Sequence, residues 1–288
     1  MTAVTAAISA LFMVLLTGIP ADQPESNPGI LLTGLQDARS IRVSTMGNLF
    51  IAEAGRNRIL KTDLEGNRID SLGRLGSGRY QFDTPVDVHP TNELKIYVAD
   101  RNNHRIQTFD RRLQFLGTVS LSQRSGYSHS YRPGMLTVDY SGRLFFYDEQ
   151  HRRTFRYDSY GQYDLSFELY SRDDRIIPTS MTILDDVLWV VDRRSDLLYR
   201  FSLSGSYLGF IQSPEPVVSI RSRGHELWVL GNRNLMQIDG TGEVLHRTAL
   251  PDQTSEEASA YDWIDFAVAG HYAFLLDRQS VVRLTNLP

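Results

Sequence analysis

A short apolar segment recurs six times along this chain, and that recurrence limits the fold more than any other feature. The copies are LFIAE (49–53), KIYVAD (95–100), LFFYD (144–148), LWVVD (188–192), LWVLG (227–231) and AFLLD (273–277). Five end in an acidic residue and one in glycine, and these last residues lie 39 to 48 positions apart. Short apolar and aromatic runs predict buried strands. A period of ~45 residues predicts a repeat architecture.

The same elements surround this strand in each repeat. Four repeats have a proline 14 or 15 positions before the last residue of the segment, at Pro85, Pro133, Pro178 and Pro216. Proline suits the first residue of a strand, where no ladder donor is needed. A polar turn and a third strand follow, and four repeats then carry a type I turn signature with Asp or Ser first and Gly fourth: DLEG (63–66), DSYG (158–161), SLSG (202–205) and DGTG (239–242).

Four antiparallel strands per repeat predict an all-β fold, a six-bladed β-propeller of four-stranded antiparallel blades over residues 29–288. The sixth repeat ends after its third strand, whereas residues 29–34 have the pattern of a fourth strand ahead of the first repeat. We expect this N-terminal strand to pair with the last repeat. That pairing would close the ring and remove two exposed sheet edges.

The N-terminal region predicts export. The apolar run 6–16 is shorter than the ~20 residues that span a bilayer, and small residues follow it up to Ala21. Residues 1–21 therefore predict a cleaved signal peptide, although no Lys or Arg precedes the run, and a retained tether is the alternative. Residues 22–28 form a short linker. We expect a bacterial periplasmic or extracellular protein with no transmembrane span in the mature chain.

The second repeat resembles a known family. TPVDV (84–88) followed by IYVADRNNHRI (96–106) closely resembles an NHL repeat, and IAEAGRNRI (51–59) in the first repeat is similar. The third repeat is a degenerate copy, and the last three keep only the strand pattern. The resemblance implies a six-bladed propeller, in agreement with the count of repeats.

Three acidic residues and three arginines share a spacing of five across one hairpin turn. They are Glu53 with Arg58, Asp100 with Arg105, and Asp148 with Arg153. A charge-assisted pair would hold each turn in place. Because the pairs recur at equivalent positions, we expect a structural role for them rather than one active site.

The loops that share a face of the ring supply candidate binding residues. Those between second and third strands, with one aromatic stretch nearby, contain Arg56, Arg101, Arg152, Arg193, Arg233, Arg278, Tyr127 and Tyr131. The loops that lead into first strands are acidic, with Asp37, Asp83, Asp173, Asp174, Glu215 and Asp262. The arginines form either a rim for an anionic partner or a solvated rim neutralised by these acids. The acids could also hold Ca²⁺, although we expect no cofactor.

Other chemistry is poorly represented in the sequence. The absence of cysteine excludes disulfides, thiolate metal sites and cysteine nucleophiles. No nucleophile elbow, P-loop or dinucleotide fingerprint occurs. His89, His225 and His271 fall in turns between first and second strands, and we interpret them as exposed turn residues. The net charge of −4 and the export signal disfavour nucleic-acid binding.

Two function classes follow. The leading hypothesis is an exported non-catalytic binding or scaffold propeller, without catalytic residues, that engages a protein or anionic glycan through its arginine- and tyrosine-rich loops. The alternative is a metal-dependent propeller enzyme, because similar six-bladed propellers include lactonases and streptogramin lyases. In that case the ligands in a carboxylate-lined channel would be Asp83, Asp174, Glu215 and Asp262.

Overall fold

The computed structural model describes residues 29–91, 93–119, 130–172, 174–192, 194–251 and 262–288. The predicted signal peptide (1–21), the linker (22–28), Asp173, Tyr127 and Arg193 lie outside the described residues. Within these ranges the regular elements are strands, apart from one 3₁₀ turn, η1 (Ala54–Arg56). This part of the chain contains no helix long and apolar enough to cross a membrane.

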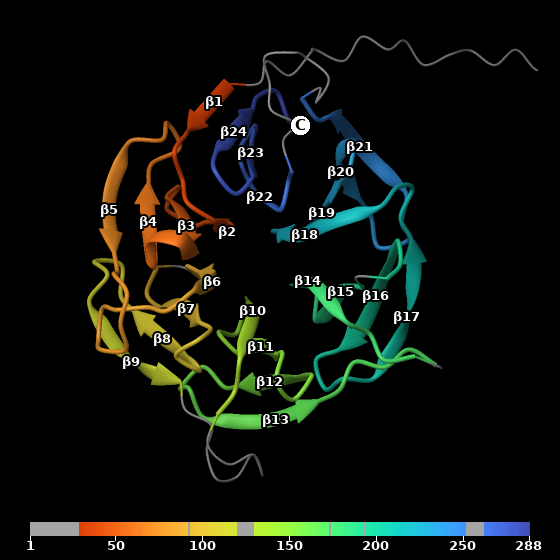
Figure 1. The fold of residues 1–288 in the computed structure, drawn as a ribbon. Coiled ribbons are helices and arrows are strands. Elements are labelled where there is room, and N and C mark those ends of the chain that lie inside the picture. Colours follow the sequence, from red (N-terminus) through yellow and green to blue (C-terminus); the bar gives the residue numbers. More distant parts are fainter. Residues whose placement is uncertain (1–28, 92, 120–129, 173, 193, 252–261) are drawn as a thin grey trace, which may run out of the picture.

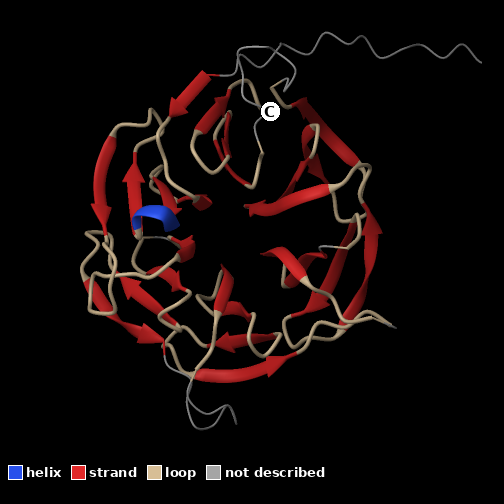
Figure 2. Ribbon diagram, viewed as in Figure 1, coloured by secondary structure: helices blue, strands red, loops and turns tan. Residues whose placement is uncertain are grey.

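The strands form six antiparallel sheets that stand as blades around one axis, which confirms the predicted six-bladed propeller (Figures 1 and 2). The first blade has β2 (Ala38–Val43), β3 (Leu49–Glu53), β4 (Arg58–Thr62) and β5 (Arg68–Leu72). The second has β6 (Pro85–His89), β7 (Ile96–Asp100), β8 (Arg105–Phe109) and β9 (Phe115–Val119). The third has β10 (Pro133–Val138), β11 (Leu144–Asp148), β12 (Arg153–Tyr157) and β13 (Tyr163–Phe167).

The second half of the ring repeats this plan. The fourth blade has β14 (Pro178–Leu184), β15 (Val187–Asp192), β16 (Leu197–Ser202) and β17 (Tyr207–Gln212). The fifth has β18 (Val217–Arg223), β19 (Glu226–Gly231), β20 (Asn234–Ile238) and β21 (Val244–Ala249). The sixth has β22 (Asp265–Ala269), β23 (Tyr272–Leu276), β24 (Val281–Leu284) and β1 (Gly29–Leu32).

The two ends of the described chain share the sixth blade. Strand β1 pairs antiparallel with β24, with Gly29 opposite Arg283 and Ile30 opposite Val282. The N-terminal strand thus supplies the outer strand that the last repeat lacks, as predicted, and the ring is closed (Figure 1).

Apolar side chains fill the spaces between neighbouring blades. The described residues form six buried apolar clusters, each shared by two adjacent blades. Between the third and fourth blades, for example, Phe145 and Tyr147 pack with Met181 and Leu188. The second strand of a blade has neighbours on both faces, so its residues are nearly all buried, as in LFIAE and LFFYD. This explains why the second strands are continuous apolar runs rather than alternating ones.

Candidate functional site in the central channel

The innermost strands, β2, β6, β10, β14, β18 and β22, line a central channel (Figure 1). Because side chains alternate along a strand, two positions per strand, two residues apart, face the channel. Where the strands begin, near the acidic anchors, the anchor-side ring contains Ser40, Asp87, Met135, Ser180, Ser219 and Asp265. Toward the first turns, the turn-side ring contains Arg42, His89, Thr137, Thr182, Arg221 and Ala267.

Oxygen atoms of the anchor-side ring tie neighbouring blades together. Asp265 Oδ2 accepts the backbone N–H of Ile41 at 3.0 Å, and Asp87 Oδ2 accepts that of Leu136 at 2.8 Å. Ser40 Oγ receives an equivalent bond from the second blade. These side chains satisfy backbone donors at the inner ends of the blades, so part of their role is structural.

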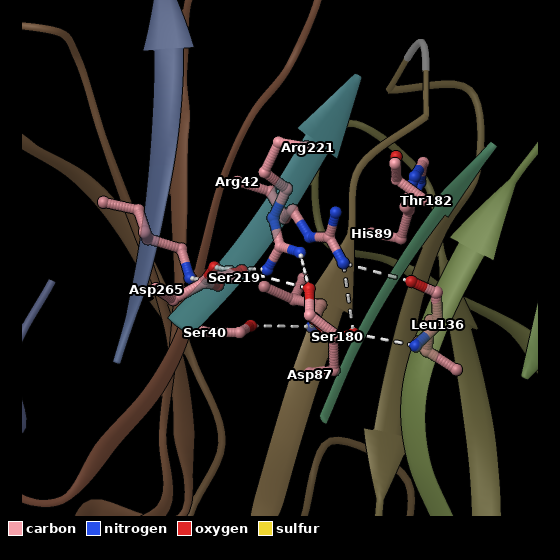
Figure 3. A network of polar contacts seen from close by, with 12 residues as sticks. Ser40, Arg42, Asp87, His89, Leu136, Ser180, Thr182, Ser219, Arg221 and Asp265 are labelled. Carbon is pink, nitrogen blue, oxygen red and sulfur yellow. Dashed lines mark hydrogen bonds and ion pairs between the residues drawn. The ribbon is translucent and has the colours of Figure 1, made fainter. Parts of the chain in front are cut away.

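Two arginines of the turn-side ring extend toward the carboxylates of the anchor-side ring (Figure 3). Arg42 Nη2 lies 3.3 Å from Asp87 Oδ2 and donates to the carbonyl of Leu136 at 3.1 Å. Arg221 Nη2 is paired with Asp265. Both arginines are buried or nearly so, with side-chain exposures of 9% and 12%, and the Nε atoms of both are buried without a hydrogen-bond partner.

The two guanidinium groups are close enough to affect each other electrostatically. Burial lowers the pKa of Arg221, and the positive charge of Arg42 lowers it further, whereas Asp265 and Asp87 oppose the shift. Two like charges in a poorly hydrated channel are costly unless opposite charges stay beside them. The carboxylates of Asp87 and Asp265 lie beside these two guanidinium groups and offset their charge.

His89 shares this environment. Burial lowers the pKa of His89 well below its usual value, and the charges of Arg42 and Arg221 lower it further. The imidazole is therefore neutral at physiological pH. Its Nδ1 lies 3.2 Å from the backbone nitrogen of Thr91, which donates to it, and 3.3 Å from Thr91 Oγ1. Because this N–H makes Nδ1 an acceptor, the neutral ring carries its proton on Nε2 in this arrangement, and only the other tautomer would donate from Nδ1 to Thr91 Oγ1.

The arginine pairs separate two cavities. The turn-side cavity, of about 190 Å³, is lined by Arg42, His89 and Arg221, together with hydroxyl groups such as Thr182. The anchor-side cavity, of about 290 Å³, lies against the same two arginines and opens toward Arg101 and Glu149. Only the turn-side cavity contains an imidazole among its lining residues, so it brings together a group that can exchange a proton and groups that can stabilise negative charge.

The neutral state of His89 predicts a pH dependence of stability. Below the pKa of ~6.5 that histidine has in the unfolded chain, the unfolded state binds a proton that the folded state does not. Acidification from pH 6.5 to 5.5 should therefore cost the wild type up to ~1.0 kcal/mol of unfolding free energy more than it costs the His89→Gln variant. Guanidinium denaturation of both proteins at pH 7.5, 6.5 and 5.5 measures this, and parallel pH curves would contradict it.

The predicted rim arginines mostly have acidic or backbone partners. Arg56 bonds to Glu53 at 2.7 Å and to the carbonyl of Gly34, and Arg101 Nε bonds to Glu149 at 2.9 Å. Arg278 pairs with Asp37 at 2.6 Å. The remaining described candidates, Arg152 and Arg233, lie in the turns of the third and fifth blades. Three of the arginines are thus neutralised locally.

Tyr131, the described member of the aromatic stretch, lies inside the molecule. It is 3% exposed and packs on Phe146, with ring centroids 5.0 Å apart. Its hydroxyl donates to the carbonyl of Val119 at 2.6 Å and accepts the backbone N–H of Ile106 at 2.8 Å. The side chain holds the second and third blades together and presents no surface to a ligand.

The turn pairs lie across their hairpins in the first two blades. Glu53 and Arg58 are 2.5 Å apart, and Asp100 and Arg105 are 2.7 Å apart. Both carboxylates are fully buried and also accept backbone N–H groups from the loop that enters the blade. Each pair therefore fixes two loops at once.

The third blade departs from the expected pairing. Asp148 is paired with His151, which lies within its own turn, and Arg153 instead bonds to Glu168 at 2.8 Å. Glu168 lies just beyond the fourth strand and also binds Arg175. Asp148 has a nearer partner in His151, and Glu168 competes for Arg153. These two contacts account for the change of partners.

The fifth blade has glycine where the other blades have an acidic anchor, and Glu215 fills the vacant space. Its carboxylate comes from the loop that enters the blade and accepts the backbone N–H of Asn234 at 2.9 Å and its side-chain amide at 2.8 Å. A Cβ on residue 231 would lie only 1.8 Å from Glu215 Oε1. Glu215 is therefore a substitute anchor.

This exchange predicts a coupled pair of substitutions. Gly231→Ala should lower the free energy of unfolding by about 1–3 kcal/mol, because the methyl group displaces Glu215 and leaves buried donors unpaired. In a Glu215→Ala background the added cost of Gly231→Ala should fall below about 1 kcal/mol, since the clash is gone. Chemical denaturation of the wild type, the two single variants and the double variant measures these free energies. Strictly additive costs would show that Glu215 does not occupy the space of the missing anchor side chain.

The residues do not fit a bound divalent metal at the predicted position. Asp83 accepts bonds from Thr84 and Asn102, and Glu215 is occupied as an anchor. Within the described ranges no group of three or more His, Asp or Glu side chains is placed to hold a metal ion. In the channel, Asp87 and Asp265 each already face a guanidinium group. This donor set is matched to arginine rather than to a hard cation, which takes six to eight oxygens.

Arg42 and Arg221 were missed by the sequence analysis, and His89 was interpreted as an exposed turn residue. A signal was present in the inner strands, where polar residues alternate with apolar ones in SIR (40–42), DVH (87–89), SMT (180–182) and SIR (219–221). Alternation of this kind marks one solvated face and one packed face. In a closed ring, the solvated face of an innermost strand faces the channel.

Comparison with known proteins agrees with this architecture. Residues 82–109 match the NHL repeat. Together with the six-bladed ring, this match confirms the predicted resemblance to NHL-repeat β-propellers. A search of curated proteins gave no match to the sequence.

Solved structures with the same fold include enzymes. A streptogramin B lyase is 11% identical, with a TM-score of 0.62 and coverage of 91% of this chain and 98% of that one. The virginiamycin B lyase of Staphylococcus aureus is 14% identical, with a TM-score of 0.61 and coverage of 91% and 99%. A gluconolactonase of Xanthomonas campestris is 14% identical, with a TM-score of 0.67 and coverage of 91% and 90%. At these identities the likeness establishes a shared fold.

These matches contradict the leading hypothesis of a non-catalytic binding or scaffold propeller. The propellers that superpose over most of their length bear the names of lyases and a lactonase. The correction favours the enzyme alternative. The partners of Arg56, Arg101, Arg278 and Tyr131, which lie within the same or neighbouring loops and strands, are not visible from spacing alone.

Proposed function

We propose that this chain is an enzyme of the lactonase or lyase type whose reaction takes place in the turn-side cavity. His89 exchanges the proton, and Arg42 with Arg221 stabilises the negative charge that develops on the substrate. The observation that carries the proposal is a neutral imidazole sharing one cavity with two buried arginines. The names of the structurally similar propellers support the reaction class.

The geometry suits either reaction. Nε2 acts as the base after a shift to the tautomer in which Nδ1–H donates to Thr91 Oγ1 and the bond from the Thr91 N–H is given up. In lactone hydrolysis, Nε2 takes the proton from a water that attacks the carbonyl and returns it to the leaving alkoxide oxygen. In elimination, Nε2 takes the proton from carbon next to a carbonyl, and the leaving group departs as the double bond forms.

The two arginines can stabilise the negative charge that both reactions create on an oxygen atom of the substrate. Hydrolysis places negative charge on a carbonyl oxygen, and elimination places it on an enolate oxygen. Donors already fixed in position by other contacts stabilise such charge without having to reorganise. Arg42 and Arg221 are fixed in this way by their bonds to Asp87, Asp265 and backbone carbonyls.

The test is an assay of the full chain against a panel of small lactones, esters and β-substituted carboxylic acids. Ring opening is followed by acid release and elimination by the absorbance of the new double bond. We expect turnover of at least one compound class by the wild type and its loss in the His89→Gln variant. Turnover that persists in that variant would overturn the assignment of the site.

A further inference from the structure

We propose that the turn-side cavity is a binding site for a compact carboxylate, whose anionic group lies between Arg42 and Arg221. The inference deepens the proposed function, on which it rests, by naming the class of substrate. Three features of the cavity favour such a ligand, namely the charge of its wall, the unused hydrogen-bond donors of its arginines and its size.

The wall of the turn-side cavity carries cationic residues and no acidic ones. Its arginines are Arg42, Arg221 and Arg223, and its fourth titratable residue is His89. The anchor-side cavity differs, because there the arginines alternate with Asp87, Glu149 and Asp265. Of the two cavities, the turn-side one alone is therefore biased toward an anion.

The two central arginines that line this cavity each have a hydrogen-bond donor without a partner. The Nε atoms of Arg42 and Arg221 are buried without a partner. Buried polar atoms are nearly always hydrogen-bonded, so two arginines that line one cavity each keep donor capacity that their present contacts do not use. An anion held there would also relieve the repulsion by which Arg42 lowers the pKa of Arg221.

The size and the remaining wall limit the ligand. A volume of about 190 Å³ is the space of roughly six water molecules at ~30 Å³ each. The rest of the wall includes Trp228, Phe266 and Val268, and Thr137 and Thr182 add hydroxyl groups. A small carboxylic acid with a short carbon skeleton matches this combination better than inorganic phosphate, which has no apolar part.

Binding is testable without any turnover. Isothermal titration of the wild type with malonate and succinate, at constant ionic strength, should give saturable binding with one site per chain. The neutral analogues malonamide and succinamide should give none, and inorganic phosphate should bind at least ~10-fold more weakly. Absence of saturable carboxylate binding up to ~10 mM, or equal binding of the diamides, would overturn the proposal.

Variants locate the site. Arg42→Gln combined with Asp87→Asn removes both members of one buried pair, so no charge is left unpaired, and should weaken malonate binding at least ~10-fold. Arg223→Gln leaves the buried pairs intact and should weaken it ~3-fold or more. Arg283→Gln, the matched control on the sixth blade, loses the same charge from a residue that also donates to one backbone carbonyl, and should bind normally. Undiminished binding in both cavity variants would place the anion elsewhere.

The two proposals fail in different ways. Malonate binding that depends on Arg42 and Arg223, in a protein that turns over no compound of the panel, would retain the anion site and remove the proposed enzyme. Turnover that requires His89, with no binding of small carboxylates, would retain the enzyme and remove the substrate class.

Discussion

Replacing Asp265 with asparagine should lower the free energy of unfolding by about 3–5 kcal/mol. The carboxylate is 2% exposed and accepts the backbone N–H of Ile41 at 3.0 Å, the hydroxyl of Ser219 at 2.9 Å and a bond from Arg221. Asparagine has the same size, so the loss comes from leaving a buried guanidinium group without its counter-charge. Equilibrium unfolding in guanidinium chloride measures the effect.

Asp37→Asn is the matched control for this substitution. Asp37 also pairs with arginines, Arg39 and Arg278, but its side chain is 37% exposed. Exposed ion pairs contribute about 0–1 kcal/mol because water screens them. If the two substitutions cost the same, the channel pair would not be the buried contact between the first, fifth and sixth blades that we describe.

Replacing His89 with glutamine should lower kcat by about 10²–10⁴-fold on any substrate of the wild-type enzyme, with a much smaller effect on KM. Glutamine can still donate and accept hydrogen bonds in the cavity but cannot exchange a proton. Because the pKa of His89 is held well below its usual value, kcat/KM of the wild type should stay level as the pH falls through 6.5. It should decline only at lower pH, when the base becomes protonated.

His225→Gln supplies the control for this variant. His225 lies in the turn between β18 and β19, a place similar to that of His89 in the second blade, but its side chain is 90% exposed and contacts Asp185. The substitution should leave kcat within a factor of about two. A loss of less than ~3-fold in His89→Gln would remove His89 from the chemistry and leave it as a lining residue.

The fold was accessible from the sequence because its evidence is local and repeated. Each second strand is a continuous apolar run such as LFIAE (49–53), and the structure places a strand at those residues. The pairing of the closing strand could be inferred because the sixth repeat lacked a fourth strand and residues 29–34 had no other predicted partner. The number of strands in each repeat and the cost of an unpaired sheet edge were sufficient to predict that the ring closes in this way.

The site was not accessible in the same way. Arg42 and Arg221 are separated by 179 positions in the chain, and only the closed ring brings them to one cavity. Whether a polar residue in an inner strand faces the channel or the next blade depends on register, and a shift of one residue reverses it. Loops rich in arginine drew attention instead, although most of those arginines are engaged by nearby carboxylates.

The joining of β1 to β24 also determines the order in which the molecule can be completed. Strand β1 must wait for its partner until β24 has been made, so the ring stays an open arc up to that point of synthesis. During that time the apolar face around Leu35, Ile41 and Ile51, which the sixth blade later covers, has no partner within the chain. The partly made propeller therefore depends on being kept from aggregation until the sixth blade has been made.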